Sequence, residues 1–93
     1  MLNENTRMIR CQDLLEADVN GEIVALHIEK GQCYGLNEVG SRVWALLAEP
    51  ISVDEICARL TEEYAIDRQT CSDEVRGLVE ELQAEGLVRT AEG

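Results

Sequence analysis

The sequence predicts a single α+β domain with a winged helix-turn-helix-like fold, in which a three-stranded antiparallel sheet packs on three helices in the order βββααα. Three observations support this prediction. β-Branched and alternating residues fill the first third of the chain, and apolar residues recur at helical spacing after Asn37. The length of 93 residues leaves room for one folded unit, and 45% hydrophobic against 29% charged residues is typical of a globular domain.

The first two strands are predicted to form a hairpin. Residues 14–19 (LLEADV) lead into Asn20-Gly21, a dipeptide that favours positive φ at both centres of a type I′ turn, and residues 22–28 (EIVALHI) follow. After a second short turn, residues 32–36 (QCYGL) supply a third strand. We therefore expect three antiparallel strands joined by tight turns.

Asn37 is the predicted N-cap of the first helix, which we expect to extend through Ala48. Val43, Trp44 and Leu47 recur at helical spacing within it. Trp44 is expected in the core, where its indole N–H needs a hydrogen-bond acceptor.

Two further helices are predicted after Pro50. Ser52 and Glu55 form a capping box at the start of the second helix. Its apolar face is expected to consist of Val53, Ile56, Cys57, Leu60 and Tyr64. The third helix is expected to begin near Thr70–Ser72 and to end at Gly86, with Val75, Leu78, Val79 and Leu82 on one apolar stripe. Leu87–Val88 is expected to pack back as a short tail.

Residues 1–10 are predicted to form a flexible N-terminal arm, and residues 11–93 a single domain. The chain contains neither an apolar signal-peptide core nor a run of about 20 apolar residues. We therefore expect a cytoplasmic protein with no membrane partner.

Acidic residues dominate the charge of the chain. Nineteen Asp and Glu against eight Lys and Arg give a net charge of −11, which repels phosphate groups. In a DNA-binding winged helix the third helix enters the major groove, but here that helix carries several carboxylates against Arg76 alone. We therefore predict no nucleic-acid partner.

The four cysteines and the single histidine show no catalytic or metal-binding pattern. No two cysteines form a C-x-x-C pair, which favours free thiols in a reducing compartment. A metal site built from Cys11, Cys33, Cys57 and His27 stays open, but Cys57 lies on an apolar stripe. No local motif joins His27 to a nucleophile and an oxyanion donor. We predict no enzymatic activity, no metal and no cofactor.

The most specific motif of the chain is Gly-x-x-Tyr-x-Leu-Asn-x-x-Gly-x-x-x-Trp, at Gly31, Tyr34, Leu36, Asn37, Gly40 and Trp44. Together with SVDEICARLTEEYAID and DEVRGLVEELQAEGLV it resembles the PqqD-like family over most of the chain. The resemblance implies a recognition element for ribosomally synthesised and post-translationally modified peptides (RiPPs). Such a module binds the leader of a precursor peptide and presents the core to modifying enzymes.

The resemblance further implies that the leader adds as an antiparallel strand to the edge of the third strand and lies against the third helix. A glycine within that strand lets a second backbone approach closely. The residues expected to bind the peptide are Gln32, Cys33, Tyr34, Gly35, Leu36, Asp73, Arg76, Leu78 and Glu80. For Leu78 the core is the favoured interpretation, because it continues the buried stripe of the third helix, and Arg76 with Glu80 could form an exposed ion pair worth under about 1 kcal/mol.

Three functional interpretations follow from the resemblance. A lasso peptide system, with a leader peptidase and a cyclase as partner enzymes, is favoured by the Tyr-x-Leu-Asn motif and the free-standing length. The alternative is a peptide chaperone for a radical S-adenosylmethionine enzyme in pyrroloquinoline quinone biosynthesis. The third is a structural docking subunit without a peptide client. In each case the acidic surface favours a partner with basic groups.

Overall fold

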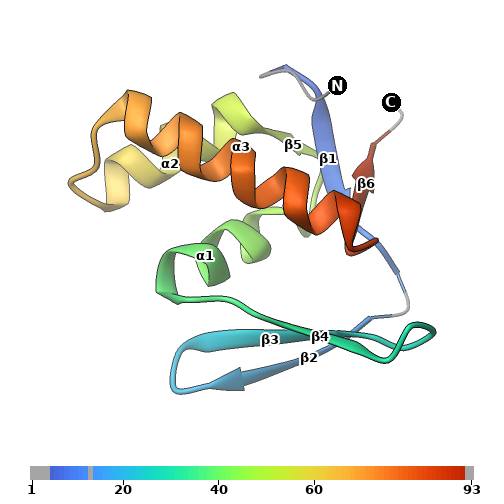
Figure 1. Ribbon diagram of the computed structural model, residues 1–93. Coiled ribbons are helices and arrows are strands. Elements are labelled where there is room, and N and C mark those ends of the chain that lie inside the picture. Colours follow the sequence, from blue (N-terminus) through green and yellow to red (C-terminus); the bar gives the residue numbers. More distant parts are fainter. Residues whose placement is uncertain (1–4, 13, 92–93) are drawn as a thin grey trace.

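The computed structural model describes residues 5–12 and 14–91 and has two small antiparallel sheets and three helices (Figure 1). One sheet has the order β2-β3-β4 and the other the order β5-β1-β6. The elements in chain order are β1 (Arg7–Arg10), β2 (Leu14–Val19), β3 (Glu22–His27), β4 (Gln32–Gly35), α1 (Glu38–Leu46), β5 (Ile51–Ser52), α2 (Val53–Glu63), α3 (Arg68–Ala84) and β6 (Val88–Thr90). The α+β class and the three-stranded sheet on three helices are confirmed, whereas the second sheet was not expected.

The β2-β3-β4 sheet has one face toward the helices and one toward solvent. Asn20 and Gly21 have φ values of 56° and 87°, as the predicted hairpin turn requires. Ala25 is fully buried and pairs with Tyr34, so these side chains lie on the inner face, toward the helices. Because side chains alternate along a strand, Leu26 and its partner Cys33 lie on the outer face.

The predicted flexible arm is corrected over residues 7–10, which form β1. This strand pairs with Ile51–Ser52 on one side and with Val88–Thr90 on the other. Met8 is only 1% exposed, so burial of its side chain holds the strand in place. The expected tail at Leu87–Val88 packs back with both side chains buried, and Val88 begins the strand β6. Residues 1–4 lie outside the described part of the chain.

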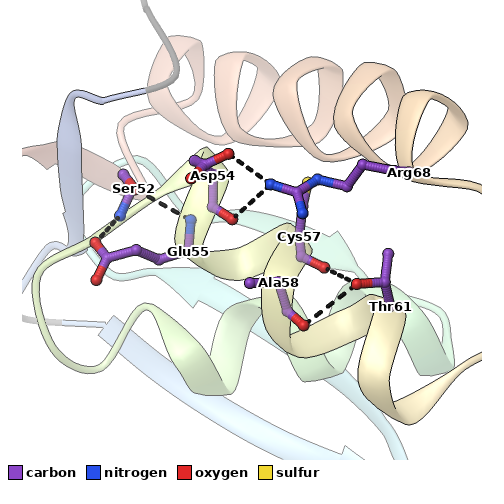
Figure 2. Close-up of polar contacts among 7 residues, drawn as sticks. All are labelled: Ser52, Asp54, Glu55, Cys57, Ala58, Thr61 and Arg68. Carbon is purple, nitrogen blue, oxygen red and sulfur yellow. Dashed lines mark hydrogen bonds and ion pairs between the residues drawn. The ribbon is translucent and has the colours of Figure 1, made fainter.

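The helices begin at capping side chains. Ser52 and Glu55 form the predicted capping box, with Ser52 Oγ accepting from the Glu55 N–H at 3.1 Å (Figure 2). The third helix starts earlier than expected, because the Asp67 carboxylate accepts from the Thr70 N–H and makes Arg68 the first helical residue. Arg68 also donates to the Asp54 carboxylate at 2.5 Å, which ties the start of α3 to the start of α2 (Figure 2).

Trp44 connects α1 with both sheets. It is 2% exposed, and its indole N–H donates to Glu16 of β2 at 2.6 Å. The Arg10 guanidinium of β1 lies over its ring, 5.2 Å from the centroid. Trp44 therefore lies in the core with its N–H paired, as the sequence predicted. The first helix ends at Leu46, slightly before the expected Ala48.

The core lies between the helices and the two sheets. Its buried members include Val43, Leu47, Val53, Ile56, Leu60, Val75, Val79 and Leu82. Tyr64 and Leu78, both expected on apolar stripes, are only partly buried and lie at its border. Within the described residues, no helix is both long and apolar enough to cross a membrane.

Candidate functional site: an open strand edge beside a groove

One edge of β4 has no strand beside it among the described residues, since β4 pairs with β3 alone. The Leu36 N–H donates to the Ile23 carbonyl at 2.8 Å, so this pair occupies a hydrogen-bonded position of the ladder. Bonded and non-bonded pairs alternate along an antiparallel ladder, which makes Tyr34 face β3 in the same way. The N–H and C=O groups of Cys33 and Gly35 therefore point to the open edge.

A groove of about 360 Å³ lies between β4 and α3. Apolar side chains from all three helices, together with the end of β4, form most of its wall. The lining residues are Tyr34, Gly35, Leu36, Asn37, Val39, Gly40, Val43, Leu60, Ile66, Cys71, Glu74, Val75 and Leu78. The groove adjoins the open edge at Gly35, so a peptide strand along β4 would place alternate side chains in it.

The wall on the strand side is fixed to α1 by two polar side chains. Ser41 Oγ accepts from the Ile23 N–H at 2.8 Å and donates to the Leu36 carbonyl at 3.2 Å. Asn37 caps α1 by accepting from the Gly40 N–H at 2.8 Å. A Cβ atom on Gly40 would lie 3.2 Å from the Asn37 side chain, so glycine keeps this turn compact. These contacts place the end of β4 relative to the groove.

Tyr34, which lines the groove, also contacts α3. The Tyr34 hydroxyl donates to the Glu81 carboxylate, which joins β4 directly to α3. This hydrogen bond, with smaller contributions from burial and from the charges of Glu81 and Glu85, raises the pKa of Tyr34 to about 12. The phenol therefore stays protonated and keeps donating throughout the physiological pH range.

Carboxylates follow the edge of α3 that faces β4. Glu74 lines the groove, Glu81 binds Tyr34, and Glu85 borders a small cavity with Tyr34. Together with Leu78 they occupy positions i, i+4, i+7 and i+11, which lie on one face of a helix. The groove thus combines an apolar floor with an acidic rim.

The structure brings together most of the residues expected to bind a peptide. Tyr34, Gly35, Leu36 and Leu78 line the groove. Gln32 and Cys33 precede them on β4 and are exposed, and both border the small cavity beside Tyr34.

Asp73, Arg76 and Glu80 do not line this groove. They lie on a different face of α3, rotated by about 140° about the helix axis from the side that faces the groove. Their role in peptide binding stays a prediction.

Sequence reasoning missed the groove residues Glu74 and Ile66 and the contact made by Glu81. The spacing of Glu74, Leu78 and Glu81 on one helical face was the available signal.

Among the described residues, the candidates for metal ligands are His, Cys, Asp and Glu side chains, and the candidates for nucleophiles are the cysteine thiols. No group of three or more His, Cys, Asp or Glu side chains in residues 5–12 and 14–91 could hold a metal ion. Burial, with a contribution from the neighbouring Cys71, raises the pKa of the Cys57 thiol to about 12, which leaves it protonated and a poor nucleophile. Cys33 is exposed on β4 and borders the same small cavity as His27, and among the described residues no hydrogen bond joins it to a base.

Comparison with known proteins finds a matching family model and similar solved structures. The family model of coenzyme PQQ synthesis protein D (PqqD) matches residues 22–88. The chain is similar to a solved structure of TbiB1 in complex with the TbiA(β) leader peptide, with 30% identity and a TM-score of 0.81 over 91% of this chain and 99% of that one.

A second solved structure is lasso peptide synthetase B1 complexed with the leader peptide. It is 21% identical, with a TM-score of 0.77 over 88% of this chain and 96% of that one, and supports the fold. No curated protein matches the chain. Since the family model covers residues 22–88, which include β3, β4 and all three helices, the chain belongs to the PqqD family.

Proposed function

We propose that this protein binds the leader of a RiPP precursor peptide by strand addition and presents the precursor to a modifying enzyme. The observation that carries the proposal is the open backbone edge of β4, beside a groove of about 360 Å³. A similar chain, TbiB1, 30% identical to this one over 91% of its length, has been solved with a leader peptide.

The backbone groups of Cys33 and Gly35 would bind the added strand. Each residue offers one N–H and one C=O at the edge, and these groups demand little of the peptide sequence. Specificity then comes from the alternate side chains that enter the groove. Leu36, Val39 and Leu78 favour an apolar side chain there, while Glu74 favours a basic neighbour.

We infer a non-catalytic role in the cytoplasm, with the lasso type of system favoured over pyrroloquinoline quinone biosynthesis. The Tyr-x-Leu-Asn motif supports the lasso assignment, and similarity to TbiB1 over 99% of that chain supports leader binding. The family description supports the alternative, in which a radical S-adenosylmethionine enzyme is the partner. The two differ in the enzyme that receives the peptide and share the same strand-addition site.

The experiment is an amide chemical-shift titration of the ¹⁵N-labelled protein with the cognate leader peptide. Saturable shifts are expected at Cys33 and Gly35 and on the groove side of α3 at Glu74 and Leu78. A leader of scrambled sequence serves as the control and should bind more weakly. Absence of shifts with the cognate leader would overturn the proposal. Shifts centred on Glu80 and its neighbours instead of the groove would place the peptide on the other face of α3.

A further inference from the structure

The outer face of the β2-β3-β4 sheet is apolar although it faces solvent. Leu15 and Val19 are 56% and 54% exposed, and Ile28, just after β3, is 52% exposed. The alternation of side chains and the strand register place six uncharged residues on this outer face: Leu15, Ala17, Val19, Val24, Leu26 and Cys33.

This distribution reverses the usual pattern of a sheet with one solvated face. Such sheets place apolar side chains inward and polar side chains outward. Here β2 directs its two carboxylates, Glu16 and Asp18, to the inner side and its apolar residues outward. A chain with a net charge of −11 has acidic residues in excess, yet those on this face are limited to Glu22 within β2, β3 and β4. Contiguous exposed apolar surface of this kind marks an interaction site.

A hollow of about 370 Å³ lies at the end of this sheet where β4 leaves it. Val19, Val24 and Gly35 give it apolar walls, and Glu22 and Asn37 add polar groups. A side chain with an aliphatic stem and a positively charged end, such as arginine, would fit these apolar walls and polar groups.

The size of the face argues against a stable dimer of this chain. Three strands of up to six residues cover on the order of 300 Å² in projection, whereas a stable interface buries about 800 Å² per partner. Two copies with charges of −11 would also repel each other. A protein that binds this face must therefore gain contact area beyond the sheet.

The leader peptide provides that additional area. Gly35 and Leu36 border both the groove and the hollow, so the two sites share one stretch of backbone. A peptide strand added to β4 would widen the sheet by about 4.8 Å and direct every second side chain to the outer face. An enzyme that modifies the peptide must contact it, and can cover the sheet and the added strand together.

We propose that the outer face of the β2-β3-β4 sheet is the docking surface for the modifying enzyme, which supplies an apolar patch and a basic group for the hollow. This inference rests on the proposed function, because the enzyme is the one that acts on the bound precursor. It assigns the two faces of one sheet to different partners: the groove side to the leader and the solvent side to the enzyme.

The test uses the double variant Leu15→Thr/Val19→Thr. Threonine favours strands and both positions are exposed, so the fold should persist. The matched control is Arg89→Thr, at an exposed strand position of the other sheet. Affinity is measured twice for each protein: for the leader peptide alone, and for the purified enzyme of the same precursor, the leader peptidase in a lasso system, with the leader at saturation.

The double variant should bind the leader within about twofold of the parent and the enzyme at least tenfold more weakly. Unchanged enzyme affinity would overturn the docking proposal. A matching loss of leader affinity would also overturn it, because the peptide itself would then occupy this face. If the parent fails to bind the leader, the proposed function fails instead. If the double variant loses its cooperative thermal transition, Val19→Thr alone, which preserves side-chain volume, replaces it.

Discussion

Replacing Gly35 by proline tests whether the open edge of β4 binds the peptide backbone. Gly35 is outside the left-handed region of φ, and its N–H points away from β3 by the alternation of the ladder. Proline at an edge position whose N–H faces solvent is tolerated in sheets. The substitution therefore removes a donor to the peptide while the protein keeps its own ladder.

The expected loss of affinity follows from the hydrogen bond that proline cannot make. A backbone hydrogen bond contributes about 0.5 to 1.5 kcal/mol net, and leaving a peptide carbonyl unpaired costs about 1 to 3 kcal/mol. A loss of about 2 kcal/mol corresponds to a dissociation constant about 30-fold higher. The thermal midpoint of the free protein should change by only a few degrees.

Isothermal titration calorimetry with the cognate leader measures this difference. The matched control is Gly35→Ala, which keeps the N–H and adds a methyl group with no heavy atom within 4 Å apart from its two chain neighbours. Alanine should bind within about threefold of the parent. Equal losses for alanine and proline would show that close approach, and not the N–H donor, limits binding. Full affinity in the proline variant, with the fold intact, would refute strand addition at this edge.

Three further predictions concern stability and charge. Trp44→Ala should cost about 3 to 5 kcal/mol and leave the protein largely unfolded at 37 °C, and a thermal midpoint within a few degrees of the parent would contradict its place in the core. Hydrogen bonds from Ser52 lower the pKa of Glu55, so the charged carboxylate stabilises the fold above its ordinary pKa of 4.5, and this stabilisation is lost as the pH falls through the lower folded value. The difference in thermal midpoint between the parent and Glu55→Gln should therefore shrink between pH 5 and pH 3. A constant difference would argue against the charged cap. For a basic leader, Glu74→Lys should weaken binding at low salt more than Glu80→Lys, which makes the same charge change outside the groove, and equal effects would show that the total charge matters more than the groove.

The parts of the fold that the sequence predicted depend on neighbouring residues. Asn20-Gly21 specifies its turn through positive φ, and the Ser52 capping box specifies a helix start through hydrogen bonds within a few residues. The second sheet depends on distant partners instead. Arg7–Arg10 shows one fully buried side chain, Met8, and its neighbours are a two-residue strand and a strand near the C-terminal end. Such pairing leaves little periodic signal in the sequence.

In the candidate site, too, the predicted part is the one that depends on residues close together in the sequence. The residues of β4 were identified because the motif from Gly31 to Trp44 is local and specific. The face of α3 that lines the groove was not identified. A helix that buries one apolar stripe has a flank on each side of it, and the stripe itself does not say which flank lies beside β4. Glu81 contacts Tyr34, which is 47 positions away in the chain, and this pairing follows from the fold and not from the local sequence.

Sharing one sheet between two partners has a thermodynamic consequence. If the enzyme covers both the outer face and the added leader strand, it binds the leader-loaded protein more tightly than the empty protein. Linkage then requires the enzyme to increase the affinity for the leader by the same factor. Substitutions on the outer face, such as Leu15→Thr, should weaken enzyme binding to the loaded and the empty protein alike, and leave both this factor and the affinity for the leader alone unchanged. Titrating the leader with and without enzyme measures the factor directly, and a value of one for the parent protein would mean that the two partners use the sheet independently.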